Sequence, residues 1–136
     1  MTITRVHHVG LVNGDLNHAQ HILVDGFGLS VDEHRTPLPG GKLGYEGTTV
    51  LEFPIGEMYY EVTAPNDSES SAAKFLDASG GRGGIHYISI ASSDIGKDVQ
   101  AMMDKGIKLQ GDWHGEGPVF LDPATCLGLE IQITNN

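Results

Sequence analysis

The alternation of apolar and polar residues divides the chain into two halves with the same order of elements. In the first half it predicts a strand, an amphipathic helix and three further strands, at residues 3–12, 15–25, 29–34, 47–54 and 58–63. In the second half it predicts the same order, at residues 85–91, 94–105, 107–113, 118–121 and 127–134. The second half therefore repeats the first.

Between the halves lie a short predicted helix at residues 71–78 and four glycines at positions 80, 81, 83 and 84. Neither half is long enough to enclose a good core alone. We therefore predict one α+β domain over residues 1–136, made of two βαβββ modules (about 3–64 and about 84–134) joined by a helical, glycine-rich linker.

The composition limits the partners of the chain. Lys and Arg number 8 against 18 Asp and Glu, for a formal net charge of -10, which disfavours nucleic acid and anionic membranes as partners. The single cysteine, Cys126, rules out an internal disulfide. With no apolar run of membrane-spanning length and no signal core, a cytoplasmic location is expected.

The repeat places histidine and glutamate residues at matching positions of the two halves. His8 lies in the first strand of one half and His86 in the first strand of the other, while Glu61 and Glu130 each lie in the last strand. A carboxylate within an apolar strand is costly unless it is paired, protonated or bound to a metal. If the halves pack face to face, two imidazoles and two carboxylates make a site for a divalent metal with positions left open for a substrate.

Taken singly, each of these residues has an ordinary explanation. A strand histidine is usually hydrogen-bonded in the core or at the surface, and a strand glutamate usually lies on the solvated face. The repetition favours the metal site, which would suit Co, Ni, Mn, Fe or Zn. His114, which follows Trp113 near a glycine-rich turn, is a further candidate for a substrate pocket.

Residues 61–68 (EVTAPNDS), 73–76 (AKFL) and 84–88 (GIHYI) resemble the vicinal oxygen chelate superfamily, and most closely its methylmalonyl-CoA epimerase branch. The resemblance implies paired βαβββ modules that form a curved mixed sheet around the metal site, with His8, Glu61, His86 and Glu130 as ligands. It also implies Glu130 as the catalytic acid/base, an acyl-CoA as a possible small-molecule substrate, and a possible homodimer. Metal coordination of the substrate suits this chemistry because it stabilises the charge that develops on oxygen.

The chain departs from the epimerase pattern at the second acid/base glutamate, where a residue near Thr49 stands. Glu46 and Glu52 are close by, but strand alternation puts both on the opposite face from Thr49. The segment 113–119 is also shorter than the corresponding epimerase loop. With Thr49, Leu51 and His114 lining the pocket, we predict a metal-dependent enzyme that abstracts a proton next to a carbonyl.

Two alternatives stay open. The departures at Thr49 and in the segment 113–119 favour a glyoxalase-type isomerase or lyase that acts on another small substrate. A non-enzymatic protein that sequesters a small molecule is the other alternative, and it disagrees with the four intact ligand candidates, since such proteins often lack the full set.

Overall fold

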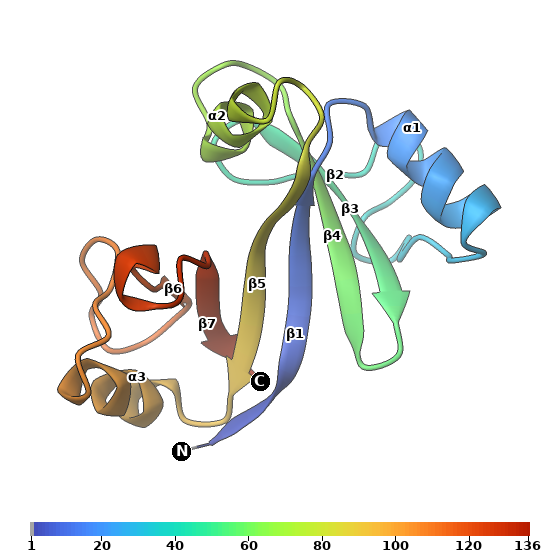
Figure 1. Ribbon diagram of the computed structural model, residues 1–136. Helices are drawn as coiled ribbons and strands as arrows, with labels where there is room; N and C mark the ends of the chain where they lie inside the picture. Colours follow the sequence, from blue (N-terminus) through green and yellow to red (C-terminus); the bar gives the residue numbers. More distant parts are fainter. Residues whose placement is uncertain (1) are drawn as a thin grey trace. The chain divides into compact units, whose positions relative to one another are not determined.

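The computed structural model describes residues 2–136 and confirms an α+β fold with a mixed sheet (Figure 1). The elements are, in chain order, β1 (Ile3–Val12), α1 (Leu16–Gln20), the π-helical turn η1 (His21–Gly26), β2 (Lys42–Leu43), β3 (Thr48–Ile55), β4 (Met58–Pro65), α2 (Ser71–Ala78), β5 (Gly84–Ser92), α3 (Ile95–Asp104), β6 (Val119–Phe120), the 3-10 turn η2 (Pro123–Thr125) and β7 (Ile131–Asn135). The hydrogen-bonded strand order is β2-β3-β4-β1-β5-β7-β6. No helix in residues 2–136 has the length and apolarity needed to cross a membrane.

The chain forms two compact units. One unit is the continuous segment Val9–His86, and the other combines Met1–His8 with Tyr87–Asn136. We call them the inner unit and the terminal unit. Strands β1 and β5 each contribute residues to both units. The two predicted βαβββ modules stay a prediction.

The inner unit is built on the antiparallel hairpin β3–β4, whose two-residue turn at Gly56 and Glu57 lies between the partners Ile55 and Met58. One face of the hairpin is apolar and packs beneath the helical segment α1–η1. Its core residues are Ala19, Leu23, Leu51, Phe53 and Val62. Asp15 caps α1 by accepting hydrogen bonds from the backbone N–H groups of Asn17 and His18, as expected for an N-cap aspartate. The opposite face of the hairpin carries Glu52 of β3 and Glu61 of β4.

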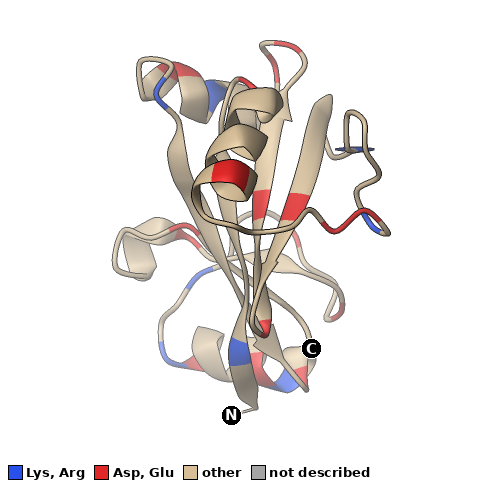
Figure 2. Ribbon diagram, turned by 90° about the vertical axis from the view of Figure 1, so that its right-hand side faces the viewer, with Lys and Arg blue, Asp and Glu red and all other residues tan. Residues whose placement is uncertain are grey.

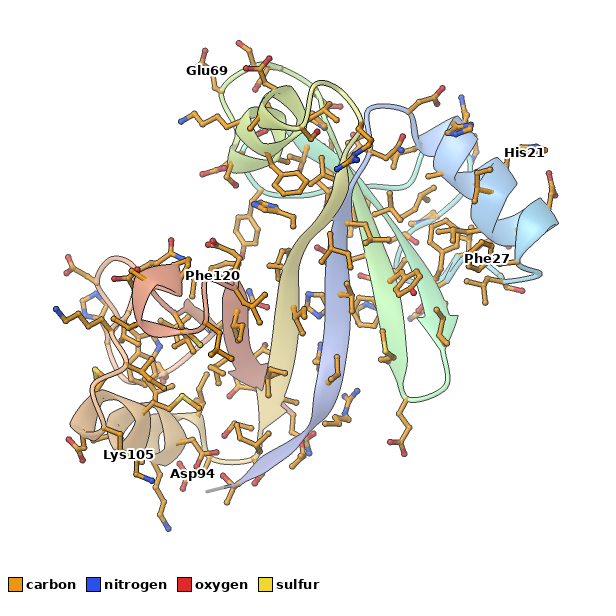
Figure 3. All side chains as sticks on the ribbon, in the orientation of Figure 1. His21, Phe27, Glu69, Asp94, Lys105 and Phe120 are labelled. Carbon is orange, nitrogen blue, oxygen red and sulfur yellow. The ribbon has the colours of Figure 1, made fainter. Side chains whose placement is uncertain are left out.

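The terminal unit packs α3 against β6 and β7, with β7 parallel to β5 and antiparallel to β6. Its core residues are Ile95, Val99, Met102, Val119, Leu121 and Ile133. Asp94 caps the start of α3 by accepting a hydrogen bond from the backbone N–H of Lys97, and Lys105 follows its last residue; both are labelled in Figure 3. Ile131 and Ile133 face this core, so the alternating residue Gln132 turns to the other face of β7.

Two predicted strands are wrong. Residues 29–34 form a coil and a turn, because the Asp32 carboxylate accepts hydrogen bonds from the backbone N–H groups of His34 and Arg35 and curls the chain. Residues 107–113 make only an isolated bridge between Leu109 and Leu121. The last strand is shorter than the predicted 127–134, and it leaves Glu130 just before β7. The helix predicted at residues 71–78 is confirmed by α2.

Candidate functional site

Two glutamates face each other on the polar side of the inner unit's hairpin. Glu52 in β3 and Glu61 in β4 are direct partners in the antiparallel register, so their side chains lie on the same face of the sheet. Glu52 is buried, with 5 % of its surface exposed. Leu51, Phe53 and Val62 alternate with them and point into the core on the other side.

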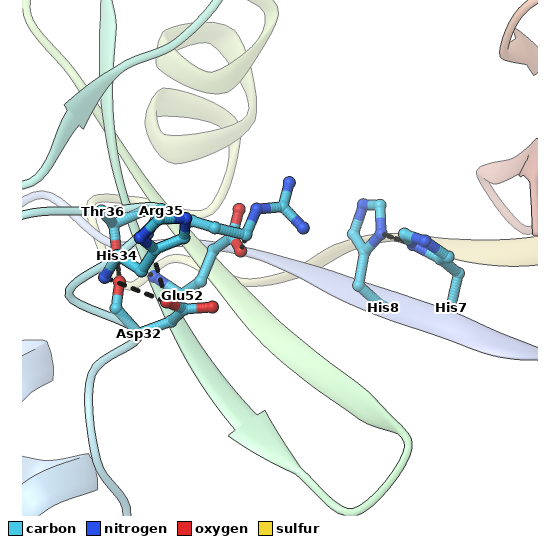
Figure 4. Close-up of polar contacts among 7 residues, drawn as sticks. All are labelled: His7, His8, Asp32, His34, Arg35, Thr36 and Glu52. Carbon is cyan, nitrogen blue, oxygen red and sulfur yellow. Dashed lines mark hydrogen bonds and ion pairs between the residues drawn. The ribbon is translucent and has the colours of Figure 1, made fainter.

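The loop between η1 and β2 is hydrogen-bonded to Glu52 through its backbone and side chains (Figure 4). Asp32 donates its N–H to the Glu52 carbonyl at 2.8 Å, and the Thr36 hydroxyl accepts the Glu52 N–H at 3.2 Å. Between these two anchors the turn projects Arg35, whose Nε lies 3.3 Å from the Glu52 carboxylate. The Arg35 guanidinium also lies over the Tyr59 ring, 5.5 Å from its centroid. The loop thus holds a half-exposed cation beside a buried carboxyl group.

This environment changes the proton affinity of two side chains. Burial raises the pKa of Glu52 above its ordinary value, and the charges of Glu61 and Asp32 act in the same direction, while Arg35 opposes them less strongly than burial. Burial also raises the pKa of Tyr59 to about 12, with the charges of Glu52 and Glu61 adding to the effect. A buried carboxyl group that keeps its proton more readily than usual is a recognised signature of an acid/base site.

In the terminal unit, three ring side chains form a hydrogen-bonded series. Nδ1 of His7 lies 2.8 Å from Nδ1 of His8, and Nε2 of His8 lies 2.9 Å from the Tyr87 hydroxyl. His8 is buried, with 6 % of its surface exposed. The Tyr87 ring packs edge-on against Phe120, with centroids 5.3 Å apart; Phe120 is labelled in Figure 3. Tyr87 is therefore fixed from two sides.

Glu130 lies beside this series. The backbone N–H of Ile88 bonds the Glu130 carbonyl at 3.0 Å, which continues the parallel pairing in which Ile88 is the partner of Ile131. Extension of this register by one residue puts Glu130, just before β7, level with Tyr87 of β5 and on the same face. The Glu130 carboxylate accepts a hydrogen bond of 2.6 Å from the Gln110 amide.

His86 has different surroundings. Strand alternation turns it to the face of β5 that Tyr87 does not occupy. Its ring lies against Phe75 of α2, with centroids 4.8 Å apart and planes inclined by 36°. Of the four predicted ligands, Glu61 and His86 belong to the inner unit, and His8 and Glu130 belong to the terminal unit.

The side chains of the terminal unit do not fit a metal centre as they stand. Both ring nitrogens of His8 lie at hydrogen-bond distance from other side chains, whereas a metal-bound histidine gives one nitrogen to the metal. Within each unit, residues 2–136 bring no three His, Cys, Asp or Glu side chains close enough to hold a metal ion. The four-ligand set stays a prediction.

The predicted pocket residues lie elsewhere than the glutamate pair. Leu51 belongs to the core beneath α1. Thr49 is on the same side of β3 as Leu51, and its hydroxyl donates to the Asn66 side-chain oxygen at 3.1 Å. His114 is exposed on the loop between α3 and β6. The polar face of the hairpin is instead formed around Glu52 and Glu61.

Sequence reasoning missed two residues that the structure brings forward, Glu52 and Tyr87. Strand alternation predicted that Glu52 lies on the opposite face from Thr49, but the pairing of Glu52 with Glu61 depends on the hairpin register. Tyr87 and Ser89 lie on the same face of β5, and the Ser89 hydroxyl donates to the Gln132 side chain at 2.7 Å. The apolar residues Ile88 and Ile90 lie on the other face. This alternation in the sequence assigns Tyr87 to the polar face of the strand.

The solved structures that are similar to this chain include three that cover 97–99% of it. A hypothetical protein from Bacillus halodurans is 23% identical with a TM-score of 0.81, covering 97% of this chain and 94% of its own. The methylmalonyl-CoA epimerase from Mycobacterium tuberculosis is 22% identical with a TM-score of 0.81, covering 98% and 89%. A Streptomyces coelicolor methylmalonyl-CoA epimerase variant in complex with 2-nitronate-propionyl-CoA is 23% identical with a TM-score of 0.80, covering 99% of both chains. At these identities the likeness shows a shared fold.

The family comparison shows which superfamily the chain belongs to, in addition to the shared fold. No curated protein matches the sequence significantly. Residues 7–118 match the family described as Glyoxalase/Bleomycin resistance protein/Dioxygenase superfamily, which confirms the resemblance found in the sequence. This match spans most of the chain and includes the elements that carry His8, Glu52, Glu61 and Tyr87, so the chain belongs to the Glyoxalase/Bleomycin resistance protein/Dioxygenase superfamily.

Proposed function

We propose that this chain is an enzyme that moves a proton at the carbon next to a carbonyl group, as an epimerase or isomerase does. The observation that carries the proposal is the facing pair Glu52 and Glu61, in which Glu52 is buried and its pKa is raised. A base works best when its proton affinity is matched to the task, and a carboxylate of raised pKa is a stronger base than an exposed one.

Epimerisation is served best by two proton carriers, one on each side of the carbon. The sequence predicts Glu130 as one carrier, and Thr49 stands where the epimerase pattern has the other. Within the inner unit we propose Glu52 as a proton carrier, because it is the buried carboxyl group on the same face as Glu61.

We propose an acyl thioester as the substrate class. Two of the similar solved structures are methylmalonyl-CoA epimerase complexes, one with 2-nitronate-propionyl-CoA and one with methylmalonyl-CoA. An anionic substrate gains nothing from a net charge of -10, so it needs a local cation. Arg35, which is half-exposed beside Glu52, supplies a planar guanidinium suited to a carboxylate or phosphate. Metal dependence, a homodimer and a cytoplasmic location stay predictions.

The proposal is tested by measuring exchange of the substrate's α-proton with solvent. Purified protein is incubated with methylmalonyl-CoA in D2O, and exchange of the α-proton is followed by NMR. Replacing Glu52 or Glu130 by Gln should each slow exchange by about 10²- to 10⁴-fold, the range for loss of a general acid or base. Glu116→Gln, on an exposed loop, is the matched control and should exchange at the wild-type rate.

Two results would contradict the proposal. Exchange that is unaffected in both glutamine variants would remove these carboxylates from the chemistry. Absence of α-proton exchange in the wild type, with and without added Co²⁺, Ni²⁺, Mn²⁺ or Zn²⁺, would contradict the enzyme proposal. Tight binding of the acyl-CoA in equilibrium dialysis would then favour a protein that sequesters the small molecule.

A further inference from the structure

The series His7–His8–Tyr87 stands at the position where the sequence places the first metal ligand. His8 Nε2 faces the Tyr87 hydroxyl at 2.9 Å, and His8 Nδ1 faces His7 at 2.8 Å (Figure 4 shows the two histidines). The residue of β5 that meets His8 is thus Tyr87, while its neighbour His86 lies against Phe75. Divalent ions of the kinds predicted here prefer imidazole, carboxylate or thiolate ligands to a neutral phenol.

The arrangement around Tyr87 is ordered. The phenol ring packs edge-on against both His8 and Phe120, with centroid distances of 5.4 Å and 5.3 Å. Glu130, the predicted acid/base, lies just before β7 and is level with Tyr87 when the register of β5 and β7 is extended by one residue. Preorganised hydroxyl donors stabilise the negative charge of an enolate oxygen, and tyrosine is among the side chains that do so without a metal.

We infer that the His8–Tyr87 pair takes the place of a metal centre in this chain, and that the Tyr87 hydroxyl is the hydrogen-bond donor to the carbonyl oxygen of the substrate. His8 is a positioning residue that holds the hydroxyl, and His7 in turn orients the His8 ring. The second half of the inference rests on the proposed function, because it names the group that stabilises the enolate oxygen. The first half concerns metal binding alone.

The first half is tested by metal analysis of the full chain, without any assay of turnover. Elemental analysis and titration with Co²⁺, followed by its visible absorption, should find no stoichiometric ion in the wild type. Tyr87→His puts an imidazole beside His8 and Glu130. Loss of a residue that only orients a metal ligand weakens metal binding by up to about 100-fold. Gain of a ligand should therefore increase the Co²⁺ affinity by at least about 100-fold. The control His86→Ala should leave the metal content unchanged.

Two results would overturn this half. A stoichiometric divalent ion in the wild type that is lost in His86→Ala would favour the four-ligand set instead. A folded Tyr87→His variant that binds no Co²⁺ would show that Tyr87 does not occupy a ligand position. The wild-type measurement decides the matter even if the histidine variant fails to fold.

The second half is tested with Tyr87→Phe, which keeps the ring packing on Phe120 and removes only the hydroxyl. The kcat for α-proton exchange should fall about 10²- to 10³-fold, as when one oxyanion donor is removed, with little change in KM. The ¹⁵N resonance of the His8 ring should shift in the same variant, because its hydrogen-bond partner is gone. An unchanged kcat would overturn the donor role, and an unshifted ring resonance would overturn the His8–Tyr87 contact.

These readouts separate the two conclusions. If methylmalonyl-CoA shows no exchange with the wild type, the proposed function fails, and the metal titration and the His8 resonance still decide whether the tyrosine stands in a ligand position. If exchange occurs and requires a bound metal, the inference fails and the proposed function stands.

Discussion

Asp98 in α3 is a fully buried carboxylate that accepts hydrogen bonds from three donors. The backbone N–H of Thr2 lies 2.9 Å from both carboxylate oxygens, the Thr2 hydroxyl donates at 2.9 Å, and the Ser92 hydroxyl donates at 2.7 Å. Burial acts to raise the pKa of Asp98, but the hydrogen bonds from Ser92 and Thr2 outweigh it and hold the pKa below its ordinary value. The charged form of Asp98 therefore stabilises the folded terminal unit.

This lowered pKa predicts a pH-dependent contribution to stability. The stabilisation is fully present above the unfolded-state pKa of about 4 and is lost as the pH falls through the lower folded-state pKa. Asp98→Asn should therefore reduce the free energy of unfolding strongly at pH 7 and much less in acid, as measured by urea denaturation. Asp112→Asn, on an exposed loop, should have little effect at either pH. An equal loss at both pH values for Asp98→Asn would contradict the charged-carboxylate explanation.

At the same scale, the candidate site was predictable in its residue types but not in its pairings. The sequence identified His8, Glu61 and Glu130 as unusual because each interrupts an apolar strand. It assigned the partner of His8 to His86 by analogy between the halves, whereas the contact at 2.9 Å is with the next residue, Tyr87. A shift of one residue on a strand exchanges the two faces. Which residue of β5 meets His8 depends on pairing across the sheet, which no local pattern contains.

At the scale of elements, Gly83 shows how closely the start of β5 approaches β1. A Cβ atom on Gly83 would overlap the carbonyl oxygen of Val12, and the residue has φ +75. Gly81 has a similar backbone, φ +84, with nothing within 4 Å of a built Cβ. Both positions disfavour a side chain, but only Gly83 adds a clash with backbone.

Alanine substitutions separate these two effects. Gly81→Ala should cost about 1–2 kcal/mol, the penalty for a left-handed residue with a Cβ. Gly83→Ala should cost clearly more, because β5 and β1 must also move apart. Thermal or urea unfolding of the two variants measures the difference, and equal losses would mean that the approach of Val12 is easily relieved.

The hairpin β3–β4 depends on its apolar face as well as its polar one. Phe53 is wholly buried beneath α1, whereas Phe27 beyond η1 is 66 % exposed. Phe53→Ala should therefore lower the free energy of unfolding by about 3–5 kcal/mol, while Phe27→Ala should have a small effect. Equilibrium denaturation followed by circular dichroism distinguishes them. A small loss for Phe53→Ala would mean that α1 settles onto the vacated space.

Element types followed from local pattern where a segment had strong periodicity and clear ends. The helices α2 and α3 and the strands β1, β3 and β4 were predicted nearly to the residue. Residues 29–34 failed because Leu29 and Val31 are apolar for a different reason, namely that they pack against the core of the inner unit from a loop. An apolar run reports burial, and burial does not require a strand.

At the scale of the whole molecule, the charge is strongly unbalanced. Acidic positions, red in Figure 2, are spread over the loops, helices and strands, and basic positions are fewer. A net charge of -10 makes the folded chain repel itself at neutral pH. Raising the salt from about 0.01 M to about 0.1 M shortens the Debye length from about 30 Å to about 10 Å and should therefore raise the Tm.

The control for this salt effect reduces the charge directly. A variant with the exposed residues Glu33 and Glu116 both changed to Lys should show a smaller rise in Tm over the same change in salt. A Tm that is independent of salt in both proteins would show that surface repulsion contributes little to the stability of this fold.

The division into units has a consequence for synthesis on the ribosome. The terminal unit joins Met1–His8 to Tyr87–Asn136, whereas the inner unit is one continuous stretch between them. The N-terminal part of the terminal unit is therefore translated before its partners in residues 87–136, among them Asn136, which Thr4 contacts. The inner unit is free to fold once residue 86 has been translated, while His8 and Tyr87 acquire their final surroundings only after residues 87–136 have followed. A stalled nascent chain would thus carry the Glu52–Glu61 hairpin without the terminal unit.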